Sequence, residues 1–199
     1  MKTPLVKTPL RTPLVLNVAV LAGVLALALT GCGGTGGGGG SPAAGPIGAD
    51  EAVAGMHAVL DKTFDGIRPA LTRVLNGPSA TPNQDAAGRS DGTAALSEYC
   101  DVTTIVAPGR RAELFARVEQ VWKALGWSVD TSGTQAGEMP TLDATTPAGY
   151  GVELEVGAPG NVYLQVSSPP IRYPEGSTAY SGGGRGDTRP TVESEHWSH

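Results

Sequence analysis

Hydrophobic and polar side chains alternate over much of the second half of the chain, and this two-residue period constrains the fold most. The alternation runs through Tyr150–Val156 and Val162–Val166, with the turn Gly157-Ala158-Pro159-Gly160 between them. It begins earlier, at Trp127–Thr131 and Leu142–Thr146. A period of two is typical of strands with one buried face. Strands joined by such short turns predict an antiparallel meander whose apolar face needs cover.

A first amphipathic helix is indicated by apolar residues that recur every three or four positions between residues 53 and 74. Asp50 is placed to cap it, and Asn76-Gly77-Pro78 ends the pattern. Because Pro69 removes a backbone donor, we expect a kink over residues 65–68 or two consecutive helices. The apolar positions are Val53, Met56, Leu60, Phe64, Ile67, Leu71 and Val74.

A second helix is predicted over Arg110–Leu125. Gly126 suits the left-handed position that ends many helices, and Trp127 can fold back on the last turn. Helix and sheet are then expected to meet through the two indoles of Trp122 and Trp127. The apolar face of this helix consists of Leu114, Val118, Val121, Trp122 and Leu125.

The order of these elements predicts an α+β fold. A β-branched stretch over Tyr99–Ala107 reads as a strand between the two helices. Residues 79–93 contain almost no apolar side chain and are predicted to be a disordered loop. We therefore expect a two-layer sandwich, with two amphipathic helices on one face of a small, mainly antiparallel sheet.

The N-terminus has the pattern of a signal peptide. Lys2, Lys7 and Arg11 precede an apolar run, Leu14–Leu29, in which only Asn17 is polar. A helix that spans a bilayer needs about 20 apolar residues, so this run is short for a permanent anchor. Its length instead fits the hydrophobic region of a cleaved signal.

Leu29-Thr30-Gly31-Cys32 follows this run and resembles the lipobox of bacterial lipoproteins. The resemblance implies that a diacylglycerol is attached to the sulfur of Cys32 and that a signal peptidase cuts between Gly31 and Cys32. Membrane lipid would then be a partner, and the protein would be anchored on the extracytoplasmic face of the cell membrane. An ordinary secretory signal or an uncleaved anchor remains the alternative. The Ala/Gly-rich composition also resembles that of cell-envelope lipoproteins of actinobacteria.

Glycine and proline mark the segment boundaries, with 29 Gly and 16 Pro in 199 residues. Glycines cluster at residues 33–40 and 176–186, on either side of the periodic region. The predicted segments are a signal peptide (1–31), the lipidated cysteine with a Gly-rich tether (32–49), the α+β domain (50–174) and a disordered tail (175–199).

The formal net charge of −5 argues against a nucleic-acid partner. Cleavage of the signal would remove three cations and no acid, which makes the chain more acidic. A chain of this charge without a basic stripe is a poor ligand for phosphate backbones.

No catalytic, metal-binding or cofactor-binding residue is predicted. His57 is the histidine nearest the apolar stripe, and no ligand partner lies close to it in sequence. Glu153 and Glu155 share one face of a strand and read as a solvated face. The tail acids and histidines Glu193, Glu195, His196 and His199 lack a scaffold to hold a metal, and Arg185-Gly186-Asp187 is a short match to the adhesion tripeptide that a Gly-rich composition can supply by chance.

Cys100 is the other cysteine. If Cys32 is acylated, Cys100 has no partner for an internal disulfide. It is then a small buried hydrophobe, a reactive thiol or half of an intermolecular disulfide.

These patterns favour a lipid-anchored, non-catalytic binding or structural module of the cell envelope, with an envelope protein or a small hydrophobic ligand as partner. An envelope enzyme with an unrecognised site is one alternative. A carrier of a hydrophobic ligand is the other, and an apolar hollow larger than about 300 Å³ would favour it.

Overall fold

The computed structural model describes residues 45–130, 141–157, 161–184 and 188–199, all within the unit Ser41–His199. The expected signal peptide, including Gly31, lies outside these residues, as do Cys32, most of the tether and the tripeptide at 185–187.

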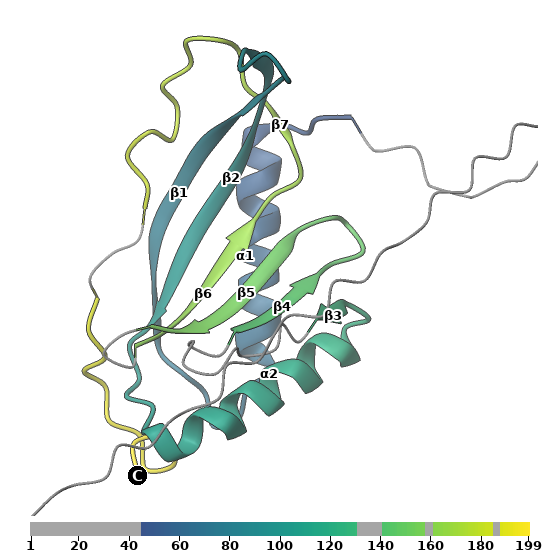
Figure 1. Ribbon diagram of the computed structural model, residues 1–199. Coiled ribbons are helices and arrows are strands. Elements are labelled where there is room, and N and C mark those ends of the chain that lie inside the picture. Colours follow the sequence, from purple (N-terminus) through teal and green to yellow (C-terminus); the bar gives the residue numbers. More distant parts are fainter. Residues whose placement is uncertain (1–44, 131–140, 158–160, 185–187) are drawn as a thin grey trace, which may run out of the picture. The chain divides into compact units, whose positions relative to one another are not determined.

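The described strands form one seven-stranded antiparallel sheet (Figure 1). Its order is β1-β2-β6-β5-β4-β3, and β7 pairs with β2. Together with two helices this confirms the α+β class. The strands are β1 Arg73–Gln84, β2 Ser90–Val102, β3 Ser128–Asp130, β4 Thr141–Thr145, β5 Gly151–Val156, β6 Val162–Ser167 and β7 Ile171–Arg172.

The predicted meander is confirmed in β4, β5 and β6. Leu154 at the middle of β5 faces Leu142 on β4 and Leu164 on β6. Val152, Leu154 and Val156 are buried, and the residues between them are only partly buried. The period of two therefore reports a real difference between the two faces of the sheet.

Helix α1 (Ala49–Asp65) is shorter than the apolar stripe predicts. It begins after Gly48, not at Asp50, and no side chain caps it. Beyond the helix, Ile67 is still fully buried, but the chain turns and enters β1 at Arg73. The stripe thus continued through a connection in which Gly66 and Pro69 disfavour helix.

Helix α2 (Arg111–Ala124) follows a single turn of 3₁₀ helix at Pro108–Arg110 and ends as predicted. Gly126 has φ +74°. Its N–H donates to the carbonyl of Lys123, and the N–H of Trp127 donates to the carbonyl of Trp122, both at 3.0 Å. This pair of bonds is the Schellman motif, and it confirms Gly126 as the residue that ends the helix.

The segment predicted to be a disordered loop, residues 79–93, instead forms the second half of β1, the turn and the first residues of β2. No residue of β1 is fully buried, so this strand has no hydrophobic period for sequence analysis to detect. Backbone pairing with β2 holds it, as in the register Ala80↔Leu96. At the turn, the carboxylate of Asp85 accepts hydrogen bonds from the backbone N–H of Ala87 and Arg89.

The predicted disordered tail is also different in the structure, where its described residues pack on the domain. Trp197 is fully buried, and its indole Nε1 donates to the carbonyl of Pro69 at 2.9 Å. The N–H of Ala107 donates to the carbonyl of Trp197, and Val192 forms a parallel bridge to Thr104. A lone tryptophan creates no periodicity, which is why composition alone suggested disorder.

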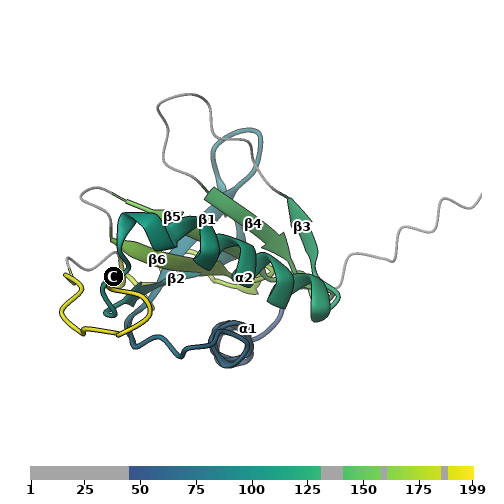
Figure 2. The same cartoon turned by 90° about the horizontal axis from the view of Figure 1, so that it is seen from below.

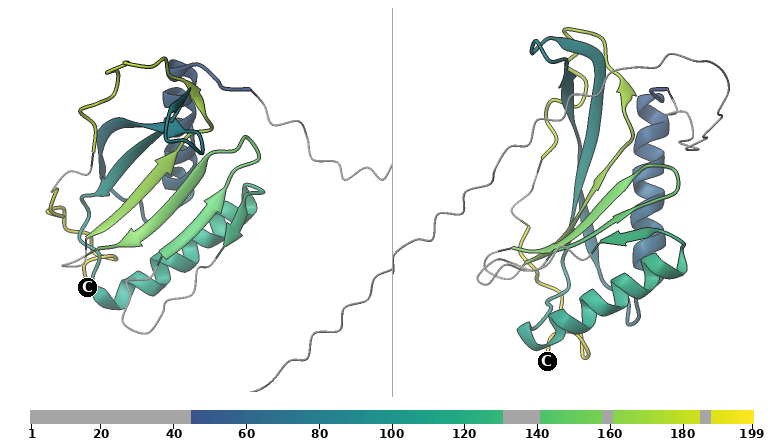
Figure 3. Two further views of the ribbon diagram at one scale, coloured as in Figure 1. Left: turned by 45° about the horizontal axis from the view of Figure 1, so that its top comes forward. Right: turned by 45° about the vertical axis from the view of Figure 1, so that its right-hand side comes forward.

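The core joins both helices to the sheet. Helix α1 runs beside β2 and β6 (Figure 2), and α2 packs near β3 and β4 (Figure 3). Trp122 is fully buried, donates from Nε1 to the hydroxyl of Thr63 on α1 at 2.9 Å, and stacks on Trp127 with ring centroids 6.1 Å apart. The predicted core position of these two indoles is confirmed.

Candidate functional site

Two adjoining hollows lie beside the helices and form what we call the helix groove. The first has a volume of about 500 Å³, lies between the end of α1 and α2, and is lined by Lys62, Gly66, Arg68, Arg117, Gln120, Val121, Ala124 and Leu125. The second has a volume of about 400 Å³ and is lined by Gly55, Ala58, Val59, Lys62, Leu125, Trp127, Thr146, Pro147, Ala148 and Tyr150. Lys62 and Leu125 line both, so the two hollows adjoin at these two side chains.

Glycines on and just beyond α1 set the shape of the groove. A Cβ at Gly66 would lie 2.6 Å from both methyl groups of Val121, so glycine allows the end of α1 to approach α2 closely. A Cβ at Gly55 would overlap the ring and hydroxyl of Tyr150. The groove therefore depends on small residues where α1 meets its neighbours.

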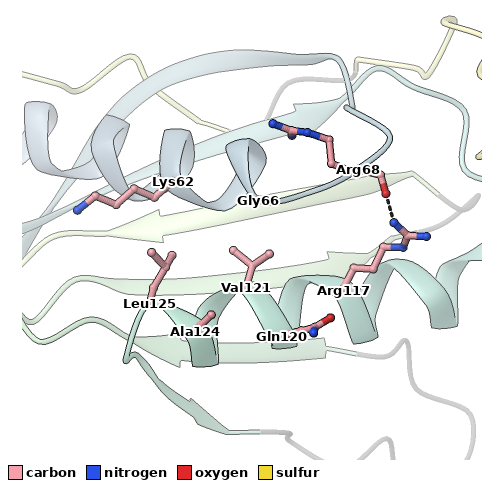
Figure 4. Close-up of a pocket in the computed structure, with 8 residues that line it drawn as sticks. All are labelled: Lys62, Gly66, Arg68, Arg117, Gln120, Val121, Ala124 and Leu125. Carbon is pink, nitrogen blue, oxygen red and sulfur yellow. Dashed lines mark hydrogen bonds between the residues drawn. The ribbon is translucent and has the colours of Figure 1, made fainter.

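The groove has an apolar floor and basic ends. Figure 4 shows Val121 and Leu125 projecting from α2 into the space beside α1, with Arg68 and Arg117 at one end and Lys62 at the other. Leu125 is 38% exposed, although large apolar side chains are usually buried. This combination of exposed apolar surface and cations is typical of a binding surface.

The cations differ in how far their charge is already paired. Arg117 binds the carboxylate of Glu113 at 2.6 Å, donates to the carbonyl of Arg68, and lies 5.4 Å from the centroid of the Trp197 ring. Hydrogen bonds from Arg117, and then from Arg110 and His196, lower the pKa of Glu113 to about 2. Arg117 thus works mainly as a structural cation that joins α2 to the C-terminal segment.

Lys62 and Arg68 keep their charge for an external partner. Both side chains are exposed, and within the described residues neither forms an ion pair. The guanidinium of Arg68 donates only to the carbonyl of its neighbour Ile67, at 2.8 Å. An anion at either Lys62 or Arg68 would therefore meet a cation without displacing a carboxylate of the described residues.

A second polar feature links α1 to the sheet. Glu98 on β2 is 1% exposed, and its carboxylate lies 2.9 Å from Nε2 of His57 on α1. His57, which the sequence left without a ligand partner, therefore has a carboxylate partner 41 positions along the chain. This pair joins α1 to β2.

Cys100 is fully buried and free. Burial is the main cause that raises the pKa of its thiol to about 12. Of the three possibilities left open by the sequence, the structure favours the small buried hydrophobe, because the reactive form of cysteine is the thiolate.

Glu153 and Glu155 are both partly buried in β5, and Glu153 lines a hollow of about 230 Å³. Glu153 stands opposite Asp143 in the register of β4 and β5. Burial, and then the charges of Asp143 and Glu155, raise the pKa of Glu153. This partial burial could not be predicted from the sequence, because it arises from contacts with neighbouring strands.

The two tail histidines that were considered as metal ligands, His196 and His199, have different partners in the structure. Nε2 of His196 lies 3.0 Å from Glu113, and the backbone carbonyl of His199 accepts from Arg110. In the part of the chain that the structure describes, no three of the His, Cys, Asp or Glu side chains gather as ligands of a metal would.

The helix groove was not predicted from the sequence. Lys62 and Arg68 surround the end of one helix, and Leu125 ends another, so only the tertiary structure brings them together. In the sequence, Leu125 is simply the last residue of the apolar stripe of the second helix. Only the structure shows that its side chain is exposed.

The sequence has no significant similarity to any protein-family model or to any curated protein sequence. Within the described residues, neither helix has the length and hydropathy needed to cross a bilayer.

Proposed function

We propose that this chain is a lipoprotein, anchored through acylated Cys32 on the outer face of the cytoplasmic membrane, with a non-catalytic domain that binds a ligand or envelope partner. The sequence Leu29-Thr30-Gly31-Cys32 after a short apolar run supports the anchor. Two or more acyl chains hold a protein stably on a membrane, whereas one holds it only marginally.

The helix groove is the observation that carries the binding role. Its hollows, of about 500 and 400 Å³, fall within the size range of small-molecule sites. It offers exposed apolar surface at Leu125 and unpaired cations at Lys62 and Arg68. These hollows also favour a carrier of a small hydrophobic ligand over a purely structural module.

The arrangement of layers is part of this proposal. We infer that α1 and α2 together cover the apolar face of the sheet, which leaves Glu153 and Glu155 on the opposite face. The buried stripe of α1, including Met56 and Leu60, and the buried Trp122 of α2 support this, since all belong to the same core cluster.

Acylation is tested by labelling cells that express the full chain with an alkyne-bearing fatty acid. We expect the label on the wild-type chain and on Cys100→Ala, the matched control, and none on Cys32→Ser. Mass spectrometry of the mature N-terminus should find a lipid-modified Cys32. A mature chain that begins elsewhere, or an unmodified Cys32, would overturn the anchor.

Occupation of the groove is tested by the alkylation rate of a cysteine placed in it. We expect Leu125→Cys to react several-fold more slowly in native envelope membranes than in the purified chain. Ala112→Cys, exposed on α2 outside the groove, should react equally fast in both. Equal rates for Leu125→Cys would show that nothing binds there.

A further inference from the structure

We propose that the helix groove binds a single-chain anionic amphiphile, such as a fatty acid or an alkyl phosphate. This inference rests on the proposed function, because it takes the groove to be the binding surface. It goes beyond that function by naming the chemical class of the ligand.

The polarity of the groove changes along its length. At one end the guanidinium of Arg117 donates to the backbone carbonyl of Arg68, whose own guanidinium points away from it, and the floor then continues over Val121 to Leu125 (Figure 4). Beyond Leu125, the second hollow adds the apolar surfaces of residues such as Val59, Trp127 and Tyr150. A ligand with a charged head and an apolar chain matches this order.

The sign of the charge selects an anion. Among the residues that the structure describes, no Asp or Glu lines either hollow, although the chain as a whole is acidic, with a net charge of −5. Two acids near the groove are already paired: Asp61 forms an ion pair with Arg73, and Glu113 is held by Arg117. Asp65, the exposed last residue of α1, is next to Gly66 but does not line the hollow, so an anionic head at Arg68 would not lie among lining carboxylates.

Lys62 gives the middle of the groove both properties. The residue is exposed and forms no ion pair within the described residues, and it lines both hollows. Lysine side chains commonly cover apolar surface with the stem and leave the charge in water. Lys62 can thus lie along an acyl chain and still attract the anionic head.

The concave shape favours a free amphiphile over a bilayer surface. The groove is a hollow between elements, and its floor residue Val121 is only partly exposed. A single chain can enter such a hollow and bury its methylene groups. A flat headgroup layer would reach the rim cations and leave the floor unfilled.

The test is calorimetric titration of the full lipidated chain in phosphatidylcholine nanodiscs with decyl phosphate below its micellar concentration, with empty nanodiscs as the blank. We expect saturable binding, stronger than that of neutral decyl maltoside or cationic decyltrimethylammonium. Each methylene removed from the chain should weaken binding about two- to fourfold.

Charge reversal identifies the head site. We expect Lys62→Glu and Arg68→Glu each to weaken binding of decyl phosphate about tenfold, as loss of a hydrogen bond to a charged group predicts. Lys123→Glu is the matched control, because Lys123 is exposed on α2 outside the groove. Leu125→Gln should weaken binding of the decyl chain more than that of a shorter chain. Circular dichroism checks that each variant is folded.

Each other result overturns the inference. Equal affinity for the three decyl compounds, or equal loss in Lys123→Glu, would exclude an anion-selective groove. Binding only to vesicles that contain phosphatidylglycerol, and not to monomeric decyl phosphate, would indicate membrane docking. If decyl phosphate does not bind while Leu125→Cys is still protected in envelope membranes, the ligand class is wrong and the proposed function stands.

Discussion

The imidazole Nε2 of His57 lies 2.9 Å from the carboxylate of Glu98 and joins the middle of α1 to the central part of β2. The side chain of Glu98 is 2% exposed, whereas that of His57 is 40% exposed. Glu98 is thus a buried acid, and its hydrogen-bond partner His57 reaches it from the protein surface. Burial of a carboxylate is costly unless it is paired, so the pair matters to the stability of the fold.

Loss of the histidine should therefore cost more than its exposure suggests. We expect His57→Ala to lower the free energy of unfolding by about 1–3 kcal/mol, because Glu98 loses a partner in the core and water replaces it only in part. Glu51→Gln, an exposed change on the same helix, is the control. Denaturant titration measures the difference, and an unchanged midpoint for His57→Ala would show that water satisfies Glu98 fully.

Trp122 should be one of the most sensitive positions of the core. Trp122→Ala removes a fully buried indole and leaves the hydroxyl of Thr63 without its donor. We expect a loss of roughly 3–5 kcal/mol in the free energy of unfolding, a large part of the roughly 5–15 kcal/mol of a typical domain. Chemical denaturation monitored by circular dichroism measures this loss. A wild-type midpoint would contradict the core role of Trp122.

Gly126→Ala should destabilise the end of α2 by about 1 kcal/mol. At φ +74° a side chain is strained, although nothing lies within 4 Å of the added Cβ. Gly109→Ala is the matched control, because Gly109 also has open space but no positive φ. If both variants unfold at the same denaturant concentration, the left-handed conformation at position 126 does not make a side chain there destabilising.

The thiol of Cys100 should resist alkylation until the domain unfolds. Its pKa is raised from 9.0 to about 12, so in the folded state it remains protonated at pH 8. Mass spectrometry of the peptide that carries Cys100 should show modification only in denaturant. Because the raised pKa favours the folded state below pH 9, stability should fall as the pH rises from about 9 towards 12. Rapid labelling under native conditions would contradict this.

Glu113 should make the attachment of the C-terminal segment sensitive to acid. Its pKa is lowered from 4.5 to about 2, chiefly by the hydrogen bond from Arg117, so its stabilising effect is present above pH 4.5 and is lost as the pH falls through about 2. We expect wild type to expose the Trp197 segment to proteolysis below about pH 3, and Glu113→Gln to expose it already at pH 7. Cleavage after residue 188 that does not depend on pH would contradict this.

The periodic elements could be predicted because burial of one face produces a regular spacing of apolar residues in the sequence. β4, β5 and β6 each have one buried face, and α2 has a buried stripe followed by a glycine at positive φ. The sequence pattern predicts too long a first helix, because buried residues continue past the end of α1, as far as Ile67. A stripe of buried residues reports the core, whether or not the backbone stays helical.

The remaining elements show no such regular spacing of apolar residues. β1 has no fully buried residue, and the C-terminal segment is attached largely by one indole and by backbone bonds. The helix groove depends on Lys62, Arg68 and Leu125, which only the crossing of the two helices brings together. The buried pair of His57 and Glu98 is likewise a product of tertiary contact.

The pairing of β1 also decides whether this long outer strand can recruit another chain. The N–H of Ala80 points away from β2 and donates to the carbonyl of Tyr180. Residues two positions away in a strand share this direction, and these are Pro78 and Pro82, which have no N–H. Between residues 78 and 82 the outer edge therefore has no free donor to offer. Along residues 78–82, β1 is thus poorly suited to the edge-to-edge pairing that leads to aggregation, even where many copies crowd together.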